Sequence, residues 1–187
     1  MSYTDVEYKF KRIGKNVSIG KNVYFRYPDM VEIGDNVIID EFCYFTTSLL
    51  IEDYVHISTG CSVIGGKESK FIMREFSAMG AGSRIICISD DFIEPCLTHA
   101  HIPLKFRKFS KGGLVEMKRH SILGTACVCH PGVIINEGAT VGSLSLVTKD
   151  LDPWWVYFGI PAKPYKKRDK DGMEDLVLKF KKDMLDK

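Results

Sequence analysis

An apolar residue recurs at every sixth position through most of this 187-residue chain. The period runs in four stretches, whose members are Ile13, Ile19 and Phe25; Ile33, Ile39, Phe45, Ile51, Ile57 and Val63; Met73, Met79 and Ile85; and Met117, Leu123, Cys129, Ile135, Val141 and Val147. An amphipathic helix would repeat every 3.6 residues and a half-buried strand every second residue, so six fits neither. Six residues can form one short strand and one bend, and three such units close a triangular coil. Successive coils then stack through parallel strand pairing.

Two further positions follow the same period. Four residues after the anchor stands a small or branched residue, which we expect inside the coil: Val17, Val23, Val37, Val55, Cys61, Ser83, Cys127, Val133, Ala139 and Ser145. Directly after the anchor stands Gly14, Gly20, Gly34, Asp40, Gly80, Gly124, Asn136 or Gly142. These residue types tolerate a positive φ, so we expect the bends there. An antiparallel sandwich is the weaker alternative, because Asn-Gly hairpin signals are absent.

Three of the units carry a recognisable motif. They are Ile-Gly-Lys-Asn-Val-Ser (13–18), Ile-Gly-Lys-Asn-Val-Tyr (19–24) and Ile-Gly-Asp-Asn-Val-Ile (33–38). This pattern resembles the hexapeptide-repeat acyltransferases, in particular the galactoside and maltose O-acetyltransferase (xenobiotic and sugar acetyltransferase) family. The resemblance implies an all-β, left-handed parallel β-helix over residues 1–168. It also implies a homotrimer that uses acetyl-CoA as co-substrate.

The longest interruption of the repeat covers about residues 89–116. A long segment of this kind inside a compact domain usually carries function. In the resembling enzymes such a loop reaches toward a neighbouring subunit and holds a catalytic histidine. By that resemblance His101 is the candidate general base, because it stands at the spacing from the next repeat where those enzymes place the histidine, and His99 is the competitor. Asp90 and Asp91 are candidates to bind the acceptor or, together with Glu94, to orient the imidazole.

The last run continues into a segment that resembles the family's coenzyme A site. Its most specific pieces are Val-Thr-Lys-Asp (147–150) and Gly-Ile-Pro-Ala-Lys (159–163). By that resemblance Gly124, Ser143, Ser145 and Thr148 line the pantetheine arm. Basic side chains suit the phosphates of coenzyme A, and the candidates are Lys149, Lys163, Lys166, Lys167 and Arg168. The sequence departs from the family pattern at Ser143-Leu144-Ser145, where Leu144 either narrows the groove or faces the core.

An amphipathic helix is predicted over residues 169–187. Its apolar positions are Met173, Leu176, Val177, Phe180 and Met184, which follow helical spacing. We expect it on the last coil or on a neighbouring chain, with capping of the open end as the preferred role.

The six cysteines predict buried free thiols rather than a disulfide framework or a metal site. Cys127 and Cys129 both fall at interior positions of the repeat, and no second Cys-x-Cys or His pair stands at zinc spacing. We therefore expect no bound metal.

Charge and hydropathy limit the partners. The net charge of +2 is too small for a nucleic-acid-coating protein, and no apolar run is long enough for a membrane span. The first residues carry no apolar signal core, so we expect a cytoplasmic protein.

The sequence predicts transfer of an acetyl group from acetyl-CoA to a hydroxyl of a sugar or a surface-polysaccharide precursor. The alternative within the same chemistry is N-acetylation of a nucleotide-linked amino sugar. Two alternatives come from other classes. One is a zinc enzyme resembling the γ-type carbonic anhydrases, with His99, His101 and His120 as ligands, and the other is a β-helix without catalytic activity.

Overall fold

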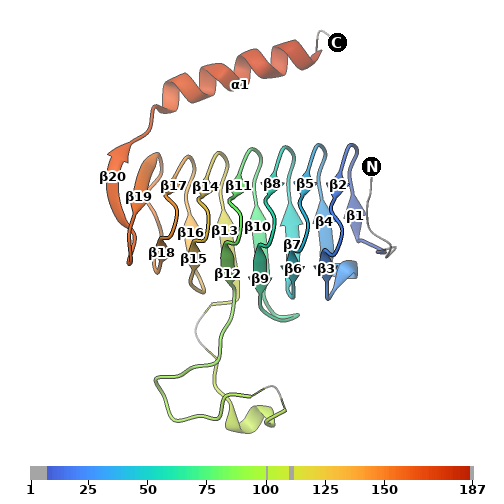
Figure 1. Cartoon of the computed structure of the whole chain (residues 1–187), viewed down its shortest axis with the longest axis vertical. Coiled ribbons are helices and arrows are strands. Elements are labelled where there is room, and N and C mark those ends of the chain that lie inside the picture. The colour runs from blue at the N-terminus through green and yellow to red at the C-terminus, as the bar shows by residue number, and fades with distance from the viewer. Residues whose placement is uncertain (1–7, 100, 110–111, 186–187) are drawn as a thin grey trace.

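The computed structural model describes residues 8–99, 101–109 and 112–185, and it shows a parallel β-helix with one C-terminal α-helix (Figure 1). Three parallel sheets form the sides of the triangular coils. The predicted left-handed parallel β-helix fold is confirmed.

The strands of the three sheets follow one another in rotation along the chain. The first sheet contains β1 (Arg12–Ile13), β4 (Val31–Ile33), β7 (Ser48–Ile51), β10 (Lys70–Met73), β13 (Leu114–Met117) and β16 (Ile134–Ile135). The second contains β2 (Ser18–Ile19), β5 (Ile38–Ile39), β8 (His56–Ile57), β11 (Ala78–Met79), β14 (Ile122–Leu123), β17 (Thr140–Val141), β19 (Trp155–Phe158) and β20 (Lys163–Lys167). The third contains β3 (Tyr24–Phe25), β6 (Tyr44–Phe45), β9 (Ser62–Ile64), β12 (Arg84–Ile86), β15 (Val128–Cys129) and β18 (Leu146–Val147). Only β20 is antiparallel to its neighbour, β19, among the strand pairs of the described residues.

The period of six marks the core, as predicted. Every anchor from Ile19 to Val147 is buried, and the small residues four positions later fill the rest of the interior. Ile13 is the exception at 51% exposed, because the first coil has a neighbour on one side only. Five of the six cysteines are buried and none forms a disulfide. Burial raises the pKa of the Cys87 thiol to about 12, so this thiol stays protonated.

The expectation of a positive φ directly after the anchors was wrong. None of the eight residues that directly follow an anchor has a positive φ. The left-handed conformation instead falls three positions after the anchor: Asn16, Asn22, Asn36, Phe42, Tyr54, Gly60, Phe76, Gly82, His120, Ala126, Gly132, Gly138 and Leu144. Where glycine follows an anchor, the coils approach closely. A Cβ on Gly20 would lie 2.6 Å from the backbone nitrogen of Glu41 in the next coil.

Aromatic residues at the left-handed positions form a ladder along one corner of the coils. Tyr54 stacks on Phe76 with ring centroids 5.2 Å apart, and Phe76 stacks in turn on His120. Trp154 follows, with its ring centroid 6.0 Å from that of His120. The ladder presents a continuous apolar surface on the outside of the β-helix.

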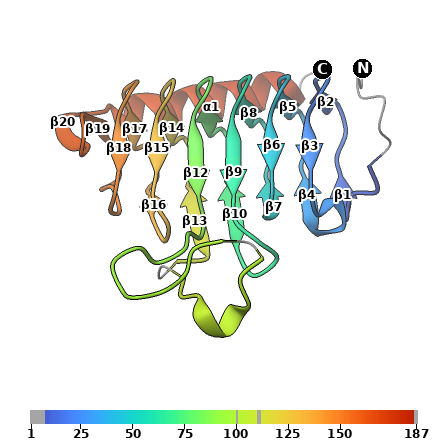
Figure 2. The same ribbon diagram turned by 60° about the horizontal axis from the view of Figure 1, so that its bottom comes forward.

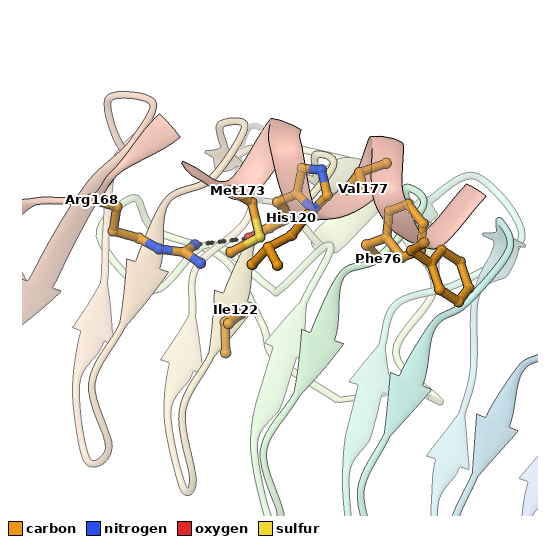
Figure 3. Close-up of a pocket in the computed structure, with 8 residues that line it drawn as sticks. Phe76, His120, Ile122, Arg168, Met173 and Val177 are labelled. Atoms are coloured by element: carbon orange, nitrogen blue, oxygen red, sulfur yellow. Dashed lines mark hydrogen bonds between the residues drawn. The ribbon is translucent and has the colours of Figure 1, made fainter. Parts of the chain in front are cut away.

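The helix α1 (Lys170–Leu185) covers this ladder. Phe180 packs edge-on against both Tyr54 and Phe76. Met173 and Val177 of the helix line a pocket together with His120 and lie on either side of it (Figure 3). The helix therefore runs along the side of the coils rather than over their open end, because the aromatic surface that can bury its apolar face lies on that side (Figures 1 and 2). At the N-terminal end of the β-helix, Tyr8 and Phe10 pack on Phe25.

Within the described ranges, no helix is both long and apolar enough to cross a membrane.

Candidate functional site

The long interruption of the repeat forms a loop that leaves the β-helix between β12 and β13. Figures 1 and 2 show it projecting from the side of the coils opposite α1. The loop contains one short 3₁₀ helix, η2 (Leu104–Phe106). Its two arms meet at its base, where Asp90 forms an antiparallel bridge with Phe109. The N–H of Asp91 donates to the carbonyl of Lys108 at 2.9 Å and closes the base further.

A charged pair spans the two arms. Arg107 donates from Nη2 and Nε to Oδ1 of Asp90, at 2.7 and 3.1 Å. The side chains of Arg107 and Asp90 are 15% and 26% exposed, so the pair is largely shielded from water. The guanidinium also lies over the ring of Phe109, 4.8 Å from its centroid. Charge-assisted hydrogen bonds in such a shielded place are stronger than those on an open surface.

A cavity of about 360 Å³ opens beside this pair. Its walls are mostly apolar, and its lining residues are Ile64, Gly65, Ile86, Ile88, Ser89, Asp90, Arg107 and Phe109. Small-molecule sites commonly combine apolar walls with a few convergent polar groups. The carboxylate of Asp90 gives this cavity a group suited to an amine or a hydroxyl of a ligand.

Asp91 has a different role from Asp90. Its carboxylate accepts hydrogen bonds from the N–H groups of Ile93 and Glu94, at 2.9 and 3.2 Å. These two bonds hold the pKa of Asp91 below its usual value. Asp91 therefore fixes a turn within the loop, while Asp90 borders the cavity.

The two loop histidines lie side by side on the protruding part of the loop. Both are exposed, and the N–H of His101 donates to Nδ1 of His99 at 3.2 Å. Their ring centroids are 5.5 Å apart. Neither borders the cavity at the loop base.

The structure gives no support to the zinc hypothesis. His120 is buried beneath α1, on the side of the coils opposite the loop that carries His99 and His101 (Figures 1 and 3). Within residues 8–99, 101–109 and 112–185, no three His, Cys, Asp or Glu side chains could hold a metal ion together.

The residues assigned to the pantetheine arm lie on the last coils. Ser143 and Thr148 are exposed, whereas Ser145 is buried. The Ser145 hydroxyl donates to the carbonyl of Gly142 at 2.7 Å and accepts from the N–H of Gly159 at 3.0 Å. Gly124 lies at a close approach of two coils, where a Cβ would stand 2.6 Å from the carbonyl oxygen of Val141. Leu144 does not face the core: it is 70% exposed, with a φ of 60°.

The basic candidates divide into two groups. Lys149, Lys163, Lys166 and Lys167 are exposed. Arg168 is half-buried, and its Nη1 donates to the carbonyls of His120 and Gly138, at 3.0 and 2.6 Å. Arg168 thereby ties the start of α1 to two coils, and burial lowers its pKa.

No protein-family model matches the chain. The chain is 32% identical over 181 residues to a dTDP-4-amino-4,6-dideoxy-D-glucose acyltransferase of Escherichia coli, and the match covers 93% of each protein. The chain belongs to the hexapeptide-repeat acyltransferase family. This relative is an acyltransferase of a dTDP-linked amino sugar rather than a galactoside or maltose O-acetyltransferase.

Solved structures of one member of this family match the chain over nearly its whole length. The N-acyltransferase AntD of Bacillus cereus, in complex with dTDP and 3-hydroxybutyryl-CoA, aligns with a TM-score of 0.88 and 33% identity over 94% of this chain and 92% of AntD. A variant of AntD in complex with dTDP-4-amino-4,6-dideoxyglucose and coenzyme A aligns with a TM-score of 0.87, also at 33% identity, over 93% of this chain and 91% of that one.

These family members favour the second of the two acetyl-transfer predictions. Both are named for acyl transfer to a nucleotide-linked amino sugar or to nitrogen, rather than to a hydroxyl. Arg107 was not among the site residues predicted from the sequence. Arg107 stands 17 positions from Asp90, and its only signal was a positive charge in a basic stretch of the loop. Its pairing depends on how the loop turns back, which no periodicity encodes.

Proposed function

We propose that this protein transfers an acyl group from acyl-CoA to the amino group of a dTDP-linked 4-amino-4,6-dideoxyhexose. The observation that carries the proposal is the match to the E. coli enzyme over 93% of both chains. The complexes of AntD support it from an independent direction, because that similar fold holds dTDP, the amino sugar and coenzyme A.

The reaction is an aminolysis of a thioester. The neutral amine attacks the carbonyl carbon, the N–C bond forms, the C–S bond breaks and the thiolate of coenzyme A leaves. The amine nitrogen loses one proton and the thiolate gains one, so the products are the amide and free coenzyme A. Backbone N–H groups are suited to stabilise the oxyanion that develops on the carbonyl oxygen.

The cavity at the loop base fits the acceptor end of this reaction. In the proposal, the carboxylate of Asp90 accepts a hydrogen bond from the sugar amine, and the apolar side chains around it hold the deoxyhexose. A 6-deoxy sugar carries a methyl group, which such walls favour over a hydroxyl. Asp91 contributes through the shape of the loop.

His101, with His99 beside it, remains the candidate to accept the proton from the amine. Within one chain both imidazoles are exposed and neither borders the cavity that would hold the amine, so this role requires the loop of one subunit to reach the cavity of a neighbouring subunit. The proposal therefore includes the homotrimer, with coenzyme A between adjacent subunits. Gly124, Ser143, Ser145 and Thr148 would contact the pantetheine arm, and Lys149, Lys163, Lys166 and Lys167 would meet the phosphates.

The acyl group is proposed to be acetyl. The experiment incubates the protein with acetyl-CoA and dTDP-4-amino-4,6-dideoxyglucose and follows release of the coenzyme A thiol, with identification of the sugar product by mass spectrometry. The matched control acceptor is dTDP-6-deoxyglucose, which carries a hydroxyl in place of the amine. We expect turnover with the amino sugar and none with the hydroxyl acceptor. Turnover with the hydroxyl acceptor alone would show that the protein is an O-acetyltransferase instead. A parallel assay with 3-hydroxybutyryl-CoA in place of acetyl-CoA tests the length of the acyl group.

A further inference from the structure

We propose that Arg107 is a positioning residue that fixes the Asp90 carboxylate so that one of its oxygens points to the acceptor amine. The inference rests on the proposed function and extends it by one residue, which acts on the substrate through Asp90.

The hydrogen-bond pattern of the pair is the first observation. An arginine fork commonly engages both oxygens of a carboxylate. Here both donors of Arg107, Nη2 and Nε, bind the same oxygen, Oδ1 of Asp90. Oδ2 receives no hydrogen bond from any residue that the structure describes. The carboxylate is thus held by one oxygen, while the other is left for a ligand in the adjoining cavity.

The second observation is that Arg107 is itself held in place. Its guanidinium lies on the ring of Phe109, and Phe109 pairs through its backbone with Asp90. The side chain of Arg107 is 15% exposed, less than the side chain of its partner Asp90. Ring, guanidinium and carboxylate are therefore ordered by the two arms of the loop together. A group ordered in this way loses little entropy when the substrate binds.

The third observation is the position of the pair in the cavity. Asp90, Arg107 and Phe109 all line it, together with the apolar side chains of Ile64 and Ile86 from the coils. An amine that enters this cavity meets one carboxylate whose direction is already set. A hydrogen bond to that carboxylate orients the nitrogen lone pair. A misplacement of reacting groups by about 1 Å can lower the rate of such a reaction substantially.

The simpler explanation is that Arg107 only ties the loop together. A second cross-arm pair provides the comparison, because Lys108 and Glu94 approach to 3.7 Å but are 54% and 61% exposed. Exposed pairs of this kind contribute little to stability. Lys108→Gln therefore removes a neighbouring charge from the same loop without touching Asp90.

The test is a double-mutant cycle on the full chain with Asp90→Asn, Arg107→Gln and the combination. Each variant is assayed for N-acylation of dTDP-4-amino-4,6-dideoxyglucose with acetyl-CoA. We expect Arg107→Gln to lower kcat/KM for the amino sugar roughly ten- to hundred-fold. The KM for acetyl-CoA should stay near the wild-type value. Because Arg107 acts through Asp90, the double variant should be no worse than Asp90→Asn alone.

Two further variants guard against a folding defect. Arg107→Lys keeps the charge and one donor, so it should recover part of the lost activity, and Lys108→Gln should match the wild type. Thermal unfolding verifies that each variant is folded. The inference is overturned if the effects of Arg107→Gln and Asp90→Asn multiply, or if Arg107→Gln raises the KM values of both substrates equally. A wild-type protein that does not N-acylate the amino sugar would instead overturn the proposed function itself.

Discussion

The imidazole of His120 stacks face to face on the ring of Phe76, with centroids 5.2 Å apart and planes 3° apart. His120 is 4% exposed beneath α1, and its Nε2 has no hydrogen-bond partner among the described residues. Burial lowers the pKa of His120, and the nearby cations Arg119 and Arg168 lower it further, against the opposing effect of Glu75 and Glu174. The neutral imidazole is thus the form that the folded protein favours.

Stability should therefore depend on pH through His120. The unfolded chain binds this proton with a pKa near 6.5, and the folded protein binds it less readily. The contribution is complete above a pH of about 6.5 and is lost as the pH falls from there through the lowered pKa of the folded protein. His120→Phe keeps the ring stack and removes the titration, so its free energy of unfolding should fall less between pH 7.5 and 5.5 than that of the wild type. Urea unfolding at both pH values measures this, and an equal fall in both proteins would contradict the account.

The glycines after the anchors should be irreplaceable for steric reasons. A Cβ on Gly80 would lie 2.5 Å from the nitrogen of Thr125, whereas one on Gly82 would meet nothing within 4 Å. Gly80→Ala should therefore destabilise the protein by about 2–3 kcal/mol. Gly82 has a φ of 69°, which Asn tolerates, so Gly82→Asn should cost less than about 1 kcal/mol. Chemical unfolding compares the two, and equal losses would show that close approach is not the reason for the glycine.

Arg168 should act on stability rather than on cofactor phosphates. Arg168→Gln removes two charge-assisted hydrogen bonds to the carbonyls of His120 and Gly138 and should cost about 2 kcal/mol of unfolding free energy. Lys166 is exposed, and Lys166→Gln should change stability by less than about 0.5 kcal/mol. Titration with acetyl-CoA separates the roles: a large loss of affinity in Arg168→Gln at unchanged stability would assign Arg168 to the cofactor instead.

The loop histidines can be separated by single substitutions. If His101 accepts the proton of the amine, His101→Ala should lower kcat by roughly 10²- to 10⁴-fold and leave the affinity for acetyl-CoA nearly unchanged. His99→Ala should have a much smaller effect, because His99 contacts His101 only through one hydrogen bond to its backbone and one edge-on ring contact. Unchanged kcat in both variants would remove the histidines from the mechanism and leave the proton to the departing thiolate or to water.

The period of six was sufficient to predict the fold and its core, because each anchor occupies the same place in every coil. Ile33, Ile51 and Met117 are all fully buried as a result. The place of α1 was beyond this pattern. Its apolar positions indicated that one face of the helix is buried, but they did not identify the surface that buries it. That surface is formed by Tyr54, Phe76 and His120, which stand at left-handed positions of the coils.

The candidate site was predicted less completely, for a related reason. Loop boundaries follow from a break in the repeat, so Asp90, His99 and His101 could be named. Which of them border a cavity depends on contacts between the two arms of the loop, and these have no period. The Asp90–Arg107 pair is such a contact. The chemistry of the acceptor likewise rests on side chains that the repeat does not constrain.

The most direct test of the central claim is the mass of the product formed from acetyl-CoA and dTDP-4-amino-4,6-dideoxyglucose by the purified protein. We predict a product heavier than the acceptor by one acetyl group, carried as an amide that resists mild alkaline hydrolysis. A product that loses its acetyl group under mild alkali, as an ester does, or the absence of any acetylated sugar, would contradict it.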